Sequence, residues 1–219
     1  TGVGCAPDKN LGPTLPRRTA EFLASELNAD VSWTSLGETG ADVDALRERL
    51  LPSLRAEVER CRASGERIDA VVILCGLNDM KSFFLHRELA KGPGRFRERL
   101  GALVASIVEA AGSECAVVLP EVRMDLTPRF ARVWPLSVAV MRTTALWERQ
   151  KRELVVTGKP DCTHVALAHV KSPENIPEWC FCVDGMHPND QGYCEWAKAI
   201  ARSILSETAA SEGICRVTS

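Results

Sequence analysis

The sequence predicts a three-layer α/β/α fold, in which a parallel sheet is covered by helices on both faces. Short apolar runs rich in β-branched residues alternate with longer stretches whose apolar residues recur every three or four positions. The clearest strand is at residues 69–75, a continuous apolar run of the kind found in strands covered on both faces. With 219 residues, 45% of them hydrophobic, the chain is expected to form a single domain over residues 1–219.

The first part of the chain contains two predicted helices with a short strand between them. Residues 16–27 form a helical stripe that starts at Pro16, a residue suited to a first helical turn. A short strand is predicted at residues 31–36. The next apolar stripe runs through residues 43–61, and Pro52 should kink or restart that helix.

The second part repeats the alternation. Helices are predicted over residues 96–111, 138–154 and 193–204, and buried strands over residues 115–119 and 163–170. Strands that alternate with helices pair in parallel and are joined by right-handed crossovers, which gives a flavodoxin-like sheet of about five strands. In such sheets ligands bind beyond the carboxyl ends of the strands, so any site should lie on the loops that follow them.

Charge and hydropathy favour a small-molecule partner. The 27 basic and 29 acidic residues are spread along the chain and leave a net charge of -2, so no block of charge points to nucleic acid or a membrane surface. No apolar run reaches the eighteen or so residues of a membrane span. The sequence leaves the oligomeric state open.

Nine cysteines are scattered along the chain, and an odd number excludes a complete disulfide framework. Cys75 lies within an apolar run, where a free thiol behaves as a small hydrophobic residue. Cys180 and Cys182 precede His187, but no second pair completes a four-ligand zinc set, so neither a metal nor another cofactor is predicted. Reduced thiols slightly favour the cytoplasm, and a sequence that starts at Thr1 gives no basis for judging a leader peptide.

Residues 184–189, just before the final helix, carry the strongest chemical pattern. Asp184 precedes His187 by three residues, so its carboxylate can turn back to accept the Nδ1 proton and leave Nε2 as a general base. The alternative is a polar turn in which Asn189 or Asp190 caps the helix.

Two further loops could stabilise a negatively charged oxygen. Asn78 follows the strand at 69–75, where its amide could donate to an oxyanion that Gly76 allows to approach closely. Gly40, in the loop at 37–41, could add a backbone N–H at the start of the next helix. Both patterns are also those of ordinary turns between strands and helices.

In this order, the three segments resemble the second, third and fifth sequence blocks of the SGNH (GDSL-type) hydrolases, and residues 1–4 resemble the tail of the first block. The resemblance implies that His187 is the catalytic base, that Asp184 orients it, and that Gly40 and Asn78 are oxyanion donors. It also implies that the first strand and the nucleophilic serine that follows it lie just upstream of Thr1.

Two functions follow from the resemblance. One is a serine esterase or lipase-type hydrolase, which would cleave a carboxylic ester or thioester through an acyl-enzyme. The other is a catalytically inactive SGNH-like domain that binds a ligand or a partner. Apolar residues of the loops after the strands could line an acyl pocket or could pack on neighbouring helices: Phe83, Phe84, Leu85, Met124, Leu126, Phe130 and Trp134.

Overall fold

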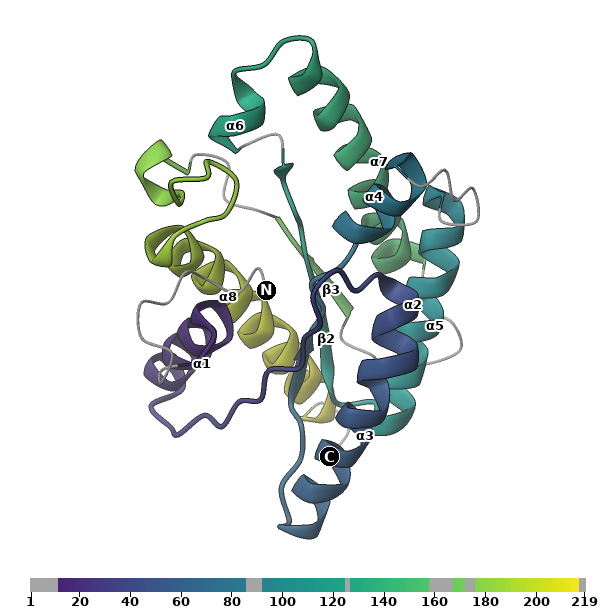
Figure 1. Ribbon diagram of the computed structural model, residues 1–219. Helices are drawn as coiled ribbons and strands as arrows, with labels where there is room; N and C mark the ends of the chain where they lie inside the picture. Colours follow the sequence, from purple (N-terminus) through teal and green to yellow (C-terminus); the bar gives the residue numbers. More distant parts are fainter. Residues whose placement is uncertain (1–11, 86–91, 125–126, 158–166, 172–175, 217–219) are drawn as a thin grey trace.

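A parallel sheet lies at the centre of the molecule, between two groups of helices (Figure 1). The computed structural model describes residues 12–85, 92–124, 127–157, 167–171 and 176–216. Within these residues the sheet has three strands in the order β1-β2-β3, namely β1 (Ala70–Val72), β2 (Ala116–Pro120) and β3 (Leu167–Val170). All the strands run in parallel, so the predicted α/β/α class is confirmed.

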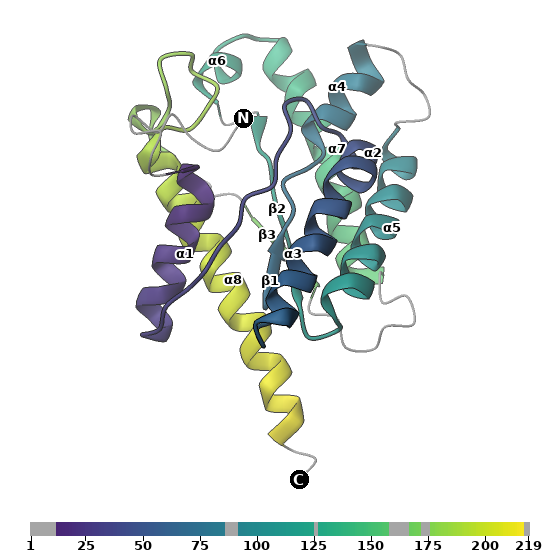
Figure 2. The same cartoon turned by 60° about the horizontal axis from the view of Figure 1, so that its bottom comes forward.

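The helices form the two outer layers. Helices α1 and α8 cover one face of the sheet, and α3, α5 and α7 cover the other (Figures 1 and 2). In chain order the helical elements are α1 (Thr14–Leu27), α2 (Val43–Ala45), η2 (Leu46–Leu50), α3 (Leu51–Ala63), α4 (Leu77–Leu85), α5 (Pro93–Ala111), α6 (Pro128–Ala131), α7 (Leu136–Thr157), η5 (Glu178–Cys180) and α8 (Asp190–Arg216). None of the described helices is long and apolar enough to cross a membrane.

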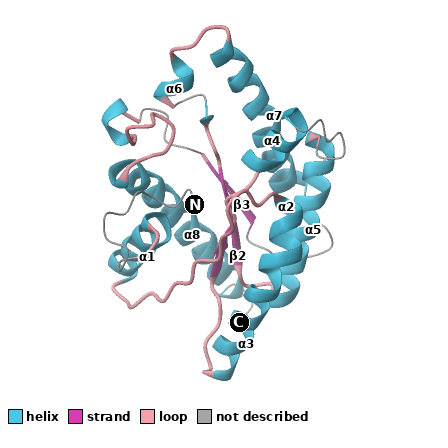
Figure 3. Cartoon of the chain, viewed as in Figure 1, coloured by secondary structure: helices cyan, strands magenta, loops and turns pink. Residues whose placement is uncertain are grey.

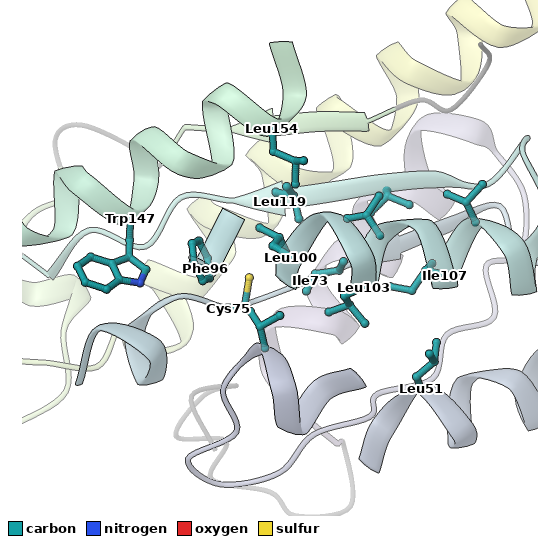
Figure 4. Close-up of a cluster of buried hydrophobic side chains, with 14 residues drawn as sticks. Leu51, Ile73, Cys75, Phe96, Leu100, Leu103, Ile107, Leu119, Trp147 and Leu154 are labelled. Atoms are coloured by element: carbon teal, nitrogen blue, oxygen red, sulfur yellow. The ribbon is translucent and has the colours of Figure 1, made fainter. Parts of the chain in front are cut away.

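Each face of the sheet has its own apolar core. On the α5 and α7 side, Phe96, Leu100 and Trp147 pack with the inward residues of β2 (Figure 4). On the α1 and α8 side, Tyr193 and Ile200 pack on Val118, which is fully buried in β2. β2 is therefore covered on both faces, as its run of apolar residues requires.

The prediction of a strand at residues 31–36 is wrong. These residues form an irregular connection between α1 and α2, drawn as loop in Figure 3, and their side chains are exposed or half-buried. Trp33 and Leu36 are 39% and 40% exposed. A strand exists only when its backbone pairs with a neighbour, and none of the described strands pairs with this segment.

Other predicted boundaries need only small changes. The predicted restart at Pro52 is confirmed, because the π-helical turn η2 ends at Leu50 and α3 begins at Leu51 with Pro52 in its first turn. β1 covers only the first part of the apolar run at 69–75, although the Ile73 N–H still donates to Val118 O. Of the strand predicted at 163–170, residues 163–166 lie outside the described residues.

Candidate active site

The turn that precedes α8 places a histidine beside an aspartate. His187 Nδ1 lies 2.5 Å from Asp184 Oδ2, and Asp184 Oδ1 accepts the backbone N–H groups of Met186 and His187. The His187 side chain, followed by these two N–H groups, lowers the pKa of Asp184 to about 2. An ionised Asp184 favours the proton on Nδ1 and leaves Nε2 to accept another. The predicted contact is present, and its catalytic role stays a prediction.

This turn is held in shape by backbone hydrogen bonds and also caps α8. Cys182 N–H donates to His187 O at 2.7 Å, and Asn189 Oδ1 accepts the N–H groups of Gln191 and Gly192. The alternative interpretation, a capping turn, is thus also correct for Asn189. The His187 and Asp184 side chains are 55% and 41% exposed, so a substrate has access to the imidazole.

The two predicted oxyanion loops contact each other. Asn78 stands in the first turn of α4, and its Nδ2 donates to Ala41 O, next to Gly40, at 2.8 Å. Gly40 has a φ of 78°, a left-handed conformation that suits glycine. Since the amide of Asn78 has two N–H bonds, one of them can hold the loop while the other donates to a substrate oxygen. This hydrogen bond therefore holds the loop that carries Gly40 against Asn78.

The turn with Asp184 and His187 and the loop that Asn78 holds lie at the same end of the sheet. In Figure 1 the segment before α8 and α4 both lie in the upper half of the view, toward the end of the sheet to which the β2 arrow points, one to the left of the sheet and the other to the right. Parallel strands require this, because Asn78 follows β1 and His187 follows β3. The prediction that Gly40 N, Asn78 and His187 Nε2 converge on one substrate carbonyl stays a prediction.

A known family pattern matches most of the sequence. The pattern of the GDSL-like lipase/acylhydrolase family matches residues 1–194, which is most of the chain. The chain belongs to this family. Membership supports hydrolysis of an ester bond in a small molecule and confirms the resemblance to SGNH hydrolases. Among curated proteins, none matches the chain in sequence.

Solved structures of esterases share the fold. An acetyl-xylooligosaccharide esterase from Geobacillus stearothermophilus is 16% identical with a TM-score of 0.63, and the match covers 92% of this chain and 85% of that one. An acetyl esterase is 13% identical with a TM-score of 0.58, covering 90% and 91%. A family 3 carbohydrate esterase from Clostridium thermocellum is 13% identical with a TM-score of 0.57, covering 89% and 87%. At these identities the likeness shows the fold alone.

The apolar residues considered for an acyl pocket separate into two groups. Phe83 packs on Trp147 with its ring centroid 5.6 Å away and belongs to the core, as the packing alternative expects. Trp134 is 81% exposed, so its surface is available to a ligand, whereas Phe84 is 50% exposed but its ring also packs on Trp147, with the centroids 5.9 Å apart. Leu126 and the side chains of Leu85 and Phe130 lie outside the described residues.

Sequence reasoning missed a buried ionic cluster beneath the Asn78 loop. Lys151 Nζ donates to Glu148 Oε1 at 2.8 Å and to Pro120 O at 3.0 Å, and the Glu148 Oε2 atom lies 3.3 Å from His169 Nε2. A Cβ placed on Gly76 would lie 3.5 Å from Lys151 Cε, so the lysine supports the loop at the end of β1. Lys151 stands four residues after Trp147 on the buried face of α7. This spacing in the sequence could have predicted that Lys151 is buried.

Proposed function

We propose that this protein hydrolyses a carboxylic ester or thioester through an acyl-enzyme formed on a serine that precedes Thr1 in the chain. His187 takes the serine proton as the oxygen attacks the carbonyl, and the protonated imidazole then gives that proton to the leaving alcohol or thiol. Water attacks the acyl-enzyme in the same way, which releases the acid and restores the serine. Gly40 N–H and Asn78 Nδ2 donate to the oxyanion in both steps.

The contact between Asp184 and His187 carries this proposal. A turn that only caps α8 needs Asn189 and has no use for an imidazole whose Nδ1 is fixed by a carboxylate. A ligand-binding domain without catalysis has no need for this arrangement together with a positioned Asn78. We therefore favour a hydrolase over an inactive domain of the same family.

The open edge of β1 supports the position of the serine. β1 pairs with β2, and no described strand pairs with its other edge; Val72 at the end of β1 and Leu74 just after it are each 37% exposed. The connection at residues 28–42 runs the length of the sheet without pairing to it (Figure 2). Exposed apolar residues on an unpaired edge suit a further parallel strand. A parallel strand beside β1 would end at the same end of the sheet as the other strands. A serine that follows it would then lie at the end of the sheet where Asn78 and His187 are found.

The test compares two proteins on p-nitrophenyl esters with acyl chains of increasing length. The 219-residue chain should be inactive, and the chain extended upstream of Thr1 should hydrolyse the short esters. In the extended protein His187→Ala should remove most activity, Asn78→Ala should cost about 10²–10³ in rate, and Asp184→Asn should cost less than His187→Ala. Glu195→Gln, on the exposed face of α8, should have no effect.

The pH profile is a second readout of the same site. Activity should fall on acidification because only a neutral imidazole accepts the serine proton. Turnover by the 219-residue chain that depends on His187 would mean that the nucleophile lies among its own residues. Folded extended protein, checked by circular dichroism, that hydrolyses none of the esters would support the inactive domain.

A further inference from the structure

An aspartate follows Asn78 at the start of α4, and the proposed reaction gives it no role. Asp79 is the third residue of α4 and is only 1% exposed. An acidic side chain in a first helical turn normally lies in water, where it interacts favourably with the helix dipole. A carboxylate that leaves water is costly unless it accepts hydrogen bonds from the protein. The burial of Asp79 therefore calls for a partner inside the fold.

That partner belongs to the segment that carries Gly40. Asp79 Oδ1 accepts the backbone N–H of Val43, 36 residues earlier in the chain, at 3.3 Å. Val43 is the first residue of α2 and follows Gly40 by three positions. Its side chain is fully buried in the same core as Phe96 and Leu100. The hydrogen bond thus ties α4 to the point where the Gly40 loop enters the core.

Two consecutive residues of α4 therefore hold one short stretch of the loop. Asn78 Nδ2 donates to Ala41 O at 2.8 Å, and Asp79 accepts the N–H of Val43, two residues further on. The views in Figures 1 and 2 both show α2 beside the start of α4. One residue spans at most about 3.5 Å of chain. Gly40, directly before Ala41, consequently has little freedom to move relative to Asn78.

The first turn of α4 is itself fixed from below. The Met80 N–H donates to Gly76 O at 2.9 Å and closes that turn. A Cβ placed on Gly76 would lie 3.4 Å from Phe96 Cζ and 3.5 Å from Lys151 Cε, so side chains of α5 and α7 pack directly against the turn. If the bond between Asp79 and Val43 is lost, the loop is thus the part that is free to shift.

We propose that Asp79 is a positioning residue, which fixes the backbone N–H of Gly40 relative to the side-chain amide of Asn78. Donors to an oxyanion act only when they lie about 2.7–3.1 Å from the position of that oxygen. A displacement of about 1 Å can cost as much as a hundredfold in rate. The catalytic effect of Asp79 rests on the proposed esterase function, whereas its hold on the loop does not, so the two are tested separately.

The first experiment measures amide hydrogen exchange by NMR in the 219-residue chain. The reporter is the Ala41 N–H, which donates to Glu38 O at 3.3 Å across the turn that contains Gly40. Asp79→Ala should raise its exchange rate about tenfold relative to the amides of α5, because the loop opens locally while the core stays closed. Asp79→Asn retains a side-chain oxygen that can accept the Val43 N–H, so its effect should be smaller.

Val108→Ala is the control for a general loss of stability. Val108 lies in the core on α5 and is 8% exposed, so its truncation weakens the fold without touching the loop. In this variant the rates of Ala41 and of the α5 amides should keep their ratio. An unchanged ratio in Asp79→Ala as well would overturn the hold of Asp79 on the loop.

The second experiment measures hydrolysis of p-nitrophenyl acetate by the extended protein. Asp79→Ala should lower kcat about tenfold or more and leave KM nearly unchanged, because the donors act on charge that develops in the transition state. Asp79→Asn should retain most of the activity, and folded Val108→Ala should keep the kcat of the parent. An unchanged kcat in Asp79→Ala, or a change in KM alone, would overturn the positioning role. A parent that hydrolyses no ester would instead contradict the esterase proposal, and the exchange rates would still decide whether Asp79 holds the loop.

Discussion

Changing Lys151 to Met should lower the free energy of unfolding far more than the same change at a surface lysine. The Lys151 and Glu148 side chains are 0% and 3% exposed, and Nζ lies 2.8 Å from Oε1. Methionine retains most of the side-chain volume next to Gly76 but leaves the Glu148 carboxylate buried without its cation. Removal of one partner from a buried ion pair costs about 3–5 kcal/mol of unfolding free energy. Val122 N–H and His169 still contact Glu148, so the lower end of that range, about 3 kcal/mol, is expected.

The loss should also depend on pH. Burial raises the pKa of Glu148, but Lys151, His169 and the Val122 N–H outweigh it and hold that pKa below its ordinary value of 4.5. The native pair therefore stabilises the fold fully above the unfolded-state pKa, and the gain is lost as the pH falls through the lower folded-state pKa. Without Lys151, burial dominates and Glu148 binds a proton readily. The gap between the native protein and Lys151→Met should be widest near neutral pH and should narrow on acidification.

Urea unfolding followed by circular dichroism, at neutral and at mildly acidic pH, measures both effects. Lys198→Met is the matched control, because Lys198 also pairs with a glutamate three residues away on a helix, at 2.6 Å, but on the surface. That exposed pair should contribute about 0–1 kcal/mol. Equal losses for Lys151→Met and Lys198→Met, or a gap that widens as the pH falls, would refute the reasoning.

Three further substitutions test the packing around the candidate site by the same unfolding measurement. Gly192→Ala would place Cβ 2.5 Å from the carbonyl oxygen of Cys180, so we expect a loss of about 1–3 kcal/mol, and an unchanged midpoint would contradict the close approach. Asp79→Ala removes a side chain that is 1% exposed and accepts the Val43 N–H at 3.3 Å, which should cost about 1–3 kcal/mol. Trp134→Ala, at an 81% exposed side chain, should change stability by less than about 0.5 kcal/mol, and a larger loss would show that the ring packs on the fold.

Local apolar patterns predicted most of the fold because buried positions are occupied by apolar residues that recur with the period of a helix or form the short run of a strand. The runs around β1 and β2 and the stripes of α5, α7 and α8 are found where their periodicity places them. Residues 31–36 show where such patterns fail. Their composition suits a strand, but pairing depends on a neighbouring strand, which the segment's own sequence does not encode.

The same distinction applies to the candidate site. Asp184 and His187 are three residues apart, so their contact could be predicted from spacing alone. Asn78 and Ala41 are 37 residues apart, and only the shared edge of a parallel sheet suggested that they meet. The pairing of Lys151 with Glu148 was missed because charged residues on a helix are normally solvated, and burial of this pair depends on β2 and β3 closing over it.

Fluorophosphonate labelling of the extended protein tests the proposed nucleophile most directly, since the reagent phosphonylates a serine that a neighbouring base activates. Peptide mass spectrometry should locate the label on one serine upstream of Thr1, and His187→Ala should abolish labelling while Glu195→Gln retains it. A label on any residue between Thr1 and Ser219, or labelling that persists without His187, would contradict the assignment of a serine hydrolase with His187 as its base.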